Sequence, residues 1–222
     1  MHGVQRTGVR LVISNNADPE RADEYAEWCN AYEAGITRLG FLANAFRFES
    51  PCAAGDGDDP RYAAIYDIVT PDPATAWPDT ERSPDYPTHL FDDPRSSLVA
   101  PVLRGSYALA ASLETPSHGA LTGATIILAD GPPDALRERR LAEAVETGVF
   151  YAASRFAIIE GYPEPPDRLE ILETDRKEPL GAYANLLELL ALPTSVRQRY
   201  SGSFRLHSAY PPSVAATPSA EH

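Results

Sequence analysis

The feature that most constrains the fold of this chain is an internal repeat in the order of its expected elements. Each half of the 222 residues reads as strand, helix, strand, strand, helix, strand. Gly40 and Gly148 each end an expected helix, because glycine adopts the left-handed conformation that often follows a helix. Seven residues after each glycine stands an arginine, Arg47 or Arg155, and a phenylalanine follows each arginine. Several matches in one order predict two similar α+β halves.

The first half contains four expected strands and one clear helix. Asp18 and Pro19 are expected to begin that helix as N-cap and first-turn proline, and apolar residues recur at helical spacing as far as Leu39. The segment 71–102 contains seven prolines, so any helix within it is short or broken. Short apolar runs predict strands over residues 8–14, 41–50, 62–69 and 103–113.

The second half repeats this order with a more regular second connection. Helices are expected over residues 134–147 and 179–192, and strands over 123–129, 150–160, 168–174 and 199–210. The expected domains are a first half over 1–115, a second half over 116–210 and a flexible tail over 211–222.

Each unit of this order is a ferredoxin-like half, in which an antiparallel sheet carries both helices on one face. The other face of each sheet must also be covered, and pairing the two sheets within one chain achieves this. We therefore expect an α+β pseudo-dimer, like an intramolecular dimeric α/β barrel, that supplies its own sheet partner. In solution the chain should be a monomer or a weak homodimer.

Charge and composition narrow the class of partner. The chain carries a net charge of −13, from 19 Lys and Arg against 32 Asp and Glu. That charge repels phosphate groups, so neither nucleic acid nor an anionic membrane surface is an expected partner. No apolar run approaches the ~20 residues of a membrane helix, and residues 1–10 lack the apolar stretch of a signal peptide. A soluble cytoplasmic protein is expected.

Sites with a strong sequence signature are absent from the chain. Cys29 and Cys52 have no metal-ligand spacing and are too few for a disulfide framework. The sequence contains no glycine-rich dinucleotide or phosphate loop and no Gly-x-Ser-x-Gly elbow. We therefore expect no metal and no organic cofactor.

A set of aromatic and basic residues in the first half points to a known superfamily. They are Trp28 and Tyr32 on the first helix, Gly40-Phe41 after it, Arg47-Phe48 on the next strand, and Tyr62 and Tyr66 on the third. In this pattern the chain resembles the dimeric α/β-barrel superfamily, which includes EthD-like proteins, antibiotic-biosynthesis monooxygenases and small polyketide cyclases. The EthD-like branch is the nearest, although Tyr32 stands where that branch has a histidine.

The resemblance implies a ligand held between the sheet and the helices of one half, often without metal or organic cofactor. We expect this site in the first half, beneath segment 71–102, because such long connections commonly cover sites. The expected catalytic residues are His89, which takes or relays a proton, and Arg47 and Tyr32, which hold the developing oxyanion. The expected substrate-binding residues are aromatic: Trp28, Tyr62, Tyr66, Trp77, Tyr86 and Tyr107.

Structural roles remain open for the three expected catalytic residues. Tyr32 lies on an apolar stripe and can be part of the core. Arg47 can form a salt bridge across the sheet, and His89 can lie in a surface loop.

The pattern suits a cofactor-independent enzyme that acts on a hydrophobic cyclic or aromatic, polyketide-like small molecule. Proton abstraction and oxyanion stabilisation begin the reactions of a cyclase, an isomerase or lyase, and a cofactor-free monooxygenase alike. Bacterial secondary metabolism is the expected setting. A non-catalytic small-molecule binding protein on the same fold is the alternative.

A haem protein is a further alternative, because the chain also resembles the chlorite dismutase group in its length and its two halves. That group places a proximal histidine on a helix of the second half. Beyond Gly123 this chain has only His207, on an expected strand, and His222 at the end. These positions argue against haem.

Overall fold

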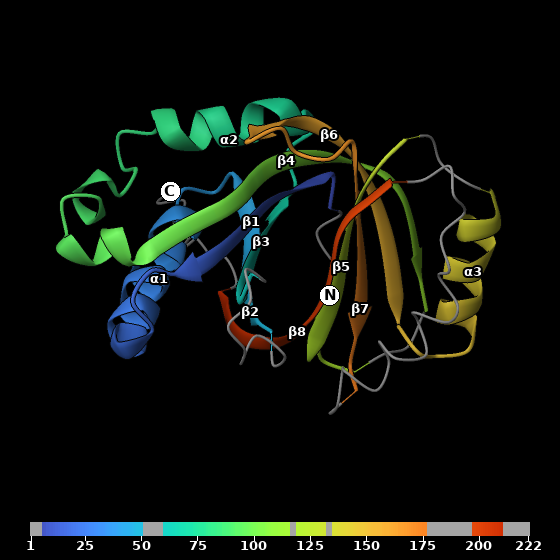
Figure 1. Cartoon of the computed structure of the whole chain (residues 1–222). Helices are drawn as coiled ribbons and strands as arrows, with labels where there is room; N and C mark the ends of the chain where they lie inside the picture. Colours follow the sequence, from blue (N-terminus) through green and yellow to red (C-terminus); the bar gives the residue numbers. More distant parts are fainter. Residues whose placement is uncertain (1–5, 51–59, 116–118, 132–134, 177–196, 211–222) are drawn as a thin grey trace, which may run out of the picture.

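The eight strands of the described chain close into one antiparallel barrel (Figure 1). The computed structural model describes residues 6–50, 60–115, 119–131, 135–176 and 197–210. The strands are β1 (Gly8–Asn16), β2 (Leu42–Glu49), β3 (Tyr62–Ile68), β4 (Val99–Glu114), β5 (Gly123–Asp130), β6 (Ala152–Tyr162), β7 (Arg168–Thr174) and β8 (Arg197–Tyr210). Their order around the barrel is β1-β3-β2-β8-β5-β7-β6-β4, and β4 pairs again with β1.

The two halves of the chain contribute the same strand order to this barrel. The order is β4-β1-β3-β2 in the first half and β8-β5-β7-β6 in the second. The halves meet edge to edge, where β2 pairs with β8 and β4 pairs with β6. Closure removes the edges of both sheets, and the sheet face that needed a cover becomes the inside of the barrel.

The interior of the barrel holds the largest hydrophobic cluster. On β1, the alternate residues Val9, Leu11 and Ile13 are at most 1% exposed and belong to this cluster. Burying one such side chain contributes about 1.5–3 kcal/mol. The other strands add large side chains to the same cluster: Phe48, Ile65, Tyr107, Ile126, Phe156, Leu169 and Phe204. Because strand side chains alternate, the intervening residues of β1 face outward.

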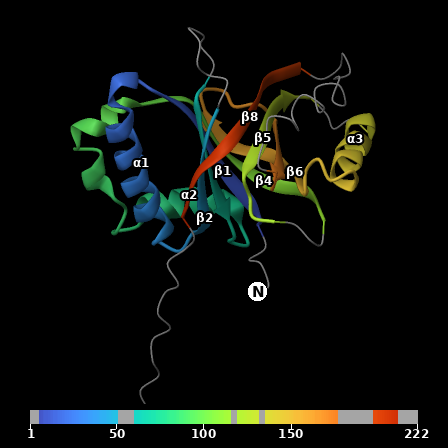
Figure 2. The same ribbon diagram turned by 90° about the horizontal axis from the view of Figure 1, so that it is seen from below.

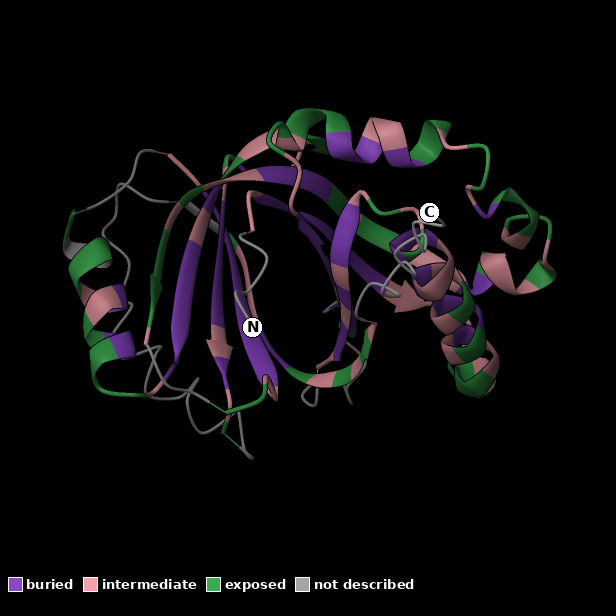
Figure 3. Cartoon of the chain, turned by 180° about the vertical axis from the view of Figure 1, so that it is seen from behind, coloured by how far each residue is buried: buried purple, intermediate pink, exposed green. Residues whose placement is uncertain are grey.

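Helices cover the outer face of the barrel on two opposite sides (Figures 1 and 2). α1 (Ala22–Thr37) contacts β2 and β8, and α3 (Ala135–Glu146) contacts β6 and β4. Buried residues follow the strands and the helix faces that are turned toward them (Figure 3). Each helix therefore closes a second, outer layer of core against the barrel wall.

The ends of these helices follow the expected local signals. The Asp18 carboxylate accepts a hydrogen bond from the backbone N–H of Glu20 at 3.2 Å, within the 3-10 turn that precedes α1. Gly40 and Gly148 follow α1 and α3 with φ of +82° and +69°. Glycine adopts this conformation without strain, so the chain turns at these glycines shortly after the last helical residues, Thr37 and Glu146.

The proline-rich segment 71–102 contains one short helix and two single turns. The helix is α2 (Pro73–Arg82), and the 3-10 turns are Thr88–Leu90 and Pro94–Leu98. The prolines therefore break this connection into short pieces, as expected. One boundary differs from expectation, since β4 begins at Val99 rather than near residue 103.

Two expected elements, the helix over 179–192 and the tail over 211–222, lie outside the described residues. Among the residues that are described, no helix has the length and apolar character needed to cross a membrane.

Candidate active site

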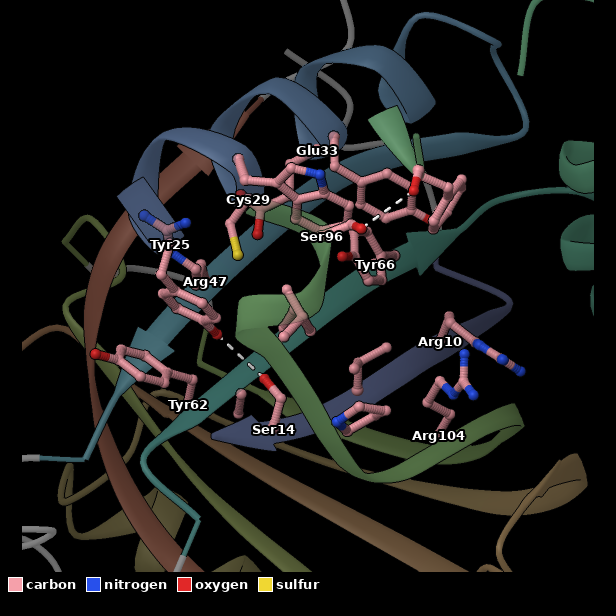
Figure 4. A pocket seen from close by; sticks show the side chains of 18 of the residues that line it. Arg10, Ser14, Tyr25, Cys29, Glu33, Arg47, Tyr62, Tyr66, Ser96 and Arg104 are labelled. Carbon is pink, nitrogen blue, oxygen red and sulfur yellow. Dashed lines mark hydrogen bonds between the residues drawn. The ribbon is translucent and has the colours of Figure 1, made fainter. Parts of the chain in front are cut away.

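A cavity of about 260 Å³ lies between α1, the outer face of the first-half sheet and the segment 71–102 (Figure 4). This volume is slightly below the usual range for ligand pockets, about 300–1,000 Å³. Its lining combines aromatic rings with a few charged and polar groups. That combination suits a largely apolar ligand that is oriented by a small number of polar contacts.

α1 supplies one wall of the cavity. Trp28, Cys29, Tyr32 and Glu33 all line it, because their spacing places them on one face of the helix. The rings of Trp28 and Tyr32 stack with their centroids 5.3 Å apart. The indole N–H of Trp28 donates to the carbonyl of Leu90 at 2.8 Å, which ties α1 to the segment above the cavity.

The sheet supplies the opposite wall through its outward-facing side chains. Arg10 and Ser14 come from β1, Arg47 from β2, and Tyr62 and Tyr66 from β3. In the β1–β3 ladder Arg10 is opposite Tyr66 and Ser14 is opposite Tyr62. Cross-strand partners share a face of the sheet, so this register gathers the four side chains on one wall.

Glu33 is a candidate functional residue that the sequence analysis did not select. Its side chain lines the cavity, is 2% exposed, and has one carboxylate oxygen, Oε2, without a hydrogen-bond partner among the described residues. Burial raises the pKa of Glu33 to about 7, while the nearby Arg47 charge acts in the opposite direction. One feature of the sequence could have identified Glu33: it lies one helical turn after Cys29, on the buried stripe of α1.

Arg47 is 2% exposed and is held by neutral groups. Its Nη1 donates to the carbonyl of Ala26 at 3.2 Å, and its Nη2 donates to Nδ1 of His207 at 3.1 Å. Within the described chain it forms no ion pair, and its Nε has no hydrogen-bond partner. The salt bridge across the sheet that was considered for this position is therefore absent from the described residues, and the corresponding Arg155 pairs with Glu138 of α3 rather than across the sheet.

His207 on β8 orients the Arg47 guanidinium, a role that the sequence analysis did not assign to it. Because a guanidinium only donates, Nδ1 of His207 accepts and the ring proton lies on Nε2. Burial and the charge of Arg47 both lower the pKa of His207. The ring is therefore neutral at neutral pH and can accept this hydrogen bond.

The tyrosine hydroxyls around the cavity remain protonated. The hydroxyls of Tyr32 and Tyr86 are 2.9 Å apart, and that of Tyr25 is 3.2 Å from Oγ of Ser14. Burial raises the pKa of Tyr25, Tyr32 and Tyr86 above the ordinary value of a phenol. Neutral phenols are hydrogen-bond donors, which is the form that stabilises an oxyanion.

The cavity brings together most of the residues that the sequence pointed to. Two of the three expected catalytic residues, Tyr32 and Arg47, line it. The expected substrate-binding residues that line it are Trp28, Tyr62, Tyr66, Trp77 and Tyr86.

His89 and Tyr107 lie away from this cavity. His89 is exposed on the turn Thr88–Leu90. Phe91, which directly follows this turn, lines the cavity instead. Tyr107 is fully buried inside the barrel, because the alternation of β4 turns it inward and turns Arg104 outward to the cavity.

The position of Tyr107 leads to a prediction about stability. Its hydroxyl is buried without a hydrogen-bond partner in the described chain, so Tyr107→Phe is expected to leave the free energy of unfolding unchanged or raise it by ~1–2 kcal/mol. Urea unfolding measures this change. Tyr25→Phe is the matched control, because it removes a hydroxyl that contacts Ser14 and should lower stability by ~1 kcal/mol. A clear loss of stability in Tyr107→Phe would contradict the prediction.

The reactivity of Cys29 is a second expected property of the cavity wall. Cys29 is buried, and burial raises the pKa of its thiol to about 11. Since the thiolate is the reactive form, Cys29 should react with Ellman's reagent ~10²-fold more slowly in the native than in the urea-unfolded protein. The measurement uses Cys52→Ser, so that one thiol is counted. Equal rates in the two states would show that Cys29 is accessible and ionised.

The closed antiparallel barrel with helices on its outer face is a fold that this chain shares with several solved structures. No protein-family profile and no curated protein sequence matches this chain. Among solved structures, an anthrone oxidase-like protein is 10% identical with a TM-score of 0.57, over 94% of each chain. A candidate chlorite dismutase is 8% identical with a TM-score of 0.58, over 92% of this chain and 96% of the other.

A candidate monooxygenase from Lactobacillus acidophilus is a third structural neighbour. It is 8% identical with a TM-score of 0.51, over 93% of this chain and 97% of the other. At such identities the likeness concerns the fold alone. The barrel fold is therefore shared with these structures, whereas the expected superfamily and its EthD-like branch stay predictions.

The residues around the cavity do not fit a haem group. In the described chain no histidine lines the cavity, since His89 is exposed elsewhere and His207 accepts from Arg47. Cys29 and the tyrosines of the wall are held protonated, whereas haem iron binds a thiolate or phenolate. Among the described residues, no group of three or more His, Cys, Asp or Glu side chains is placed to hold a metal ion.

Proposed function

We propose that this protein is a cofactor-independent enzyme that abstracts a proton from a hydrophobic cyclic or aromatic small molecule. The observation that carries the proposal is Glu33: a buried carboxylate in an aromatic cavity, with a pKa of about 7 and one oxygen that has no hydrogen-bond partner among the described residues. A general base is most effective when its pKa lies near the working pH. Glu33 thus takes the role that the sequence analysis gave to His89.

The groups around Glu33 supply the stabilisation of negative charge that the proton transfer also needs. When the Glu33 carboxylate removes a proton from an activated carbon or a phenol, negative charge develops on the ligand oxygen. Nε of Arg47, which has no hydrogen-bond partner in the described part of the chain, and the neutral Tyr32 hydroxyl are the donors that would stabilise this oxyanion. Both are fixed in place, Arg47 by His207 and Tyr32 by Tyr86, so little reorganisation accompanies the step.

The aromatic lining supports a flat ligand. Trp28 stacks on Tyr32, and Tyr86 and Phe91 pack around them with ring centroids 5.8–6.4 Å apart. Such a wall favours offset and edge-on contacts with another ring. The name of the anthrone oxidase-like neighbour agrees with this ligand class. Cyclase, isomerase or lyase, and cofactor-free monooxygenase reactions all begin with this proton transfer, and bacterial secondary metabolism in the cytoplasm is the proposed setting.

We also propose that the barrel is a tandem of two ferredoxin-like halves, 1–115 and 116–210, that acts as a monomer or weak homodimer. The equal strand order of the two halves supports this division. The first half lines the cavity, since every described residue that lines it lies between Arg10 and Arg104, while His207 of the second half supports Arg47.

Proton exchange tests the proposed function without knowledge of the product. Anthrone is incubated with the protein in D2O, and incorporation of deuterium at its acidic methylene carbon is followed by NMR. The protein should accelerate exchange above the buffer rate, with Glu33 taking the proton and solvent returning a deuteron. Binding without any acceleration would overturn the enzyme proposal in favour of a carrier protein.

A further inference from the structure

One end of the cavity carries two arginines that the proposed proton transfer does not use. Arg10 of β1 and Arg104 of β4 lie side by side there, away from Tyr25, Arg47 and Tyr62 at the other end (Figure 4). We infer that this pair binds a carboxylate group of the ligand. The inference rests on the proposed function and specifies its substrate class as aromatic or cyclic carboxylic acids.

Arg10 is placed as a ligand-binding group rather than as a surface charge. Its side chain is 9% exposed, and its guanidinium carbon lies 4.6 Å from the centre of the Trp77 ring. Its Nη1 donates to Oγ of Ser106 at 2.9 Å, but its Nε is buried and has no hydrogen-bond partner in the described chain. A buried charged donor without an acceptor is costly, so an acceptor atom on a ligand would be favourable here.

Arg104 brings a second positive charge to the same place. The β1–β4 register sets Arg104 opposite Val12 and Ser106 opposite Arg10, so Arg104 and Arg10 share the outer face. Burial lowers the pKa of Arg10, Glu160 and Glu81 raise it, and the like charge of Arg104 acts in the same direction as burial. Arg104 forms no ion pair within the described residues. An anion between the two groups would relieve this repulsion.

Two carboxylates also lie near Arg10, and both have other contacts. Glu160 of β6 is half exposed and approaches Nη1 of Arg10 at 3.5 Å, the same nitrogen that contacts Ser106. Glu81 of α2 accepts a hydrogen bond from the Trp77 indole N–H at 2.8 Å. Neither forms a hydrogen bond with Nε of Arg10. Glu160 and Glu81 reduce the net positive charge at this end of the cavity, but they leave Nε of Arg10 available to a ligand.

The tyrosine pair connects this end to the reacting end. Tyr32 and Tyr86 line the cavity together with both arginines and Glu33, and the two tyrosine hydroxyls are 2.9 Å apart. Tyr32 also directly precedes Glu33 on α1, and both side chains line the same cavity. A flat acid would place its carboxylate at the arginines, its ring along the aromatic wall and its acidic C–H or phenol near Glu33.

Binding of a matched pair of probes tests this inference. The probes are 2-naphthoate and its uncharged analogue 2-naphthamide, and titration calorimetry measures their affinities. The acid should bind at least ~10-fold more tightly than the amide, since charge-assisted hydrogen bonds are the stronger ones. Arg104→Gln should weaken the acid by ~10-fold and leave the amide unchanged. Arg104 is exposed, so this variant is expected to fold.

Further variants separate the inference from charge effects and from the proposed function. Arg82→Gln removes an exposed arginine that does not line the cavity and should leave both affinities unchanged. Arg10→Gln should act like Arg104→Gln. Glu33→Gln should keep naphthoate binding even if it abolishes proton exchange. Equal affinity for acid and amide, or an equal loss for both probes in Arg104→Gln, would overturn the inference, and exchange measured on anthrone would be untouched by that result.

Discussion

Replacing Glu33 with glutamine is expected to reduce proton exchange and turnover by ~10²–10⁴-fold, the usual contribution of a positioned general base. Glutamine has nearly the same shape as glutamate but cannot take a proton. Exchange of the methylene protons of anthrone in D2O measures the loss. Far-UV circular dichroism and the unfolding midpoint of the variant establish that the barrel is intact.

Glu27→Gln is the matched control for this loss. Glu27 is on the same helix but is exposed and pairs with Arg95 at 3.0 Å on the surface, so its replacement should leave the rate unchanged. The wild-type rate should also rise with pH and level off above about 7, because Glu33 must be ionised to act. Full activity of Glu33→Gln would remove Glu33 from the mechanism and with it the main support for the proposed function.

The same substitution is expected to stabilise the folded protein at alkaline pH, which is unusual for a change in a buried residue. The pKa of Glu33 is raised from 4.5 to about 7 on folding. Between these values the folded state binds more protons at this site than the unfolded state, so stability falls as the pH rises. Above pH 7 the ionised carboxylate costs up to ~3 kcal/mol, which glutamine avoids.

Urea unfolding at several pH values distinguishes this effect from ordinary packing changes. The gain in free energy of unfolding of Glu33→Gln over the wild type should be small near pH 5 and should grow to its full value near pH 8. The comparison cancels the titration of all other groups, which both proteins share. Glu27→Gln should show no such trend. A difference that does not change with pH would mean that Glu33 has an ordinary pKa.

Local chemistry in the sequence was sufficient to predict the elements that surround the site. Asp18 caps the first turn, and Gly40 and Gly148 follow helices at positive φ. The causes of these features lie within a few neighbouring residues, so they can be found without the fold. Alternation on β1 likewise separates the inward Val9 and Leu11 from the outward side chains.

The way in which the two sheets combine could not be predicted from such local signals. The repeat indicated that each sheet needs a partner within the chain, but the contact is edge to edge, through β2–β8 and β4–β6. These pairs join residues far apart in sequence, such as Phe48 with Leu206. Backbone hydrogen bonding is possible between almost any two strands, and the choice among them depends on the packing of the whole barrel.

The features of the candidate site also divide into those that the sequence determined and those that only the tertiary structure decided. Sequence periodicity by itself determined that Trp28 and Tyr32 share a helix face and that Arg47 follows on the next strand, because those relations are local. Only the tertiary structure decided that Glu33 is buried with one carboxylate oxygen unpaired among the described residues, that His207 from the last strand holds Arg47, and that Tyr107 lies inside the barrel. Burial and pKa depend on every element that packs around a group, and those elements come from distant parts of the chain.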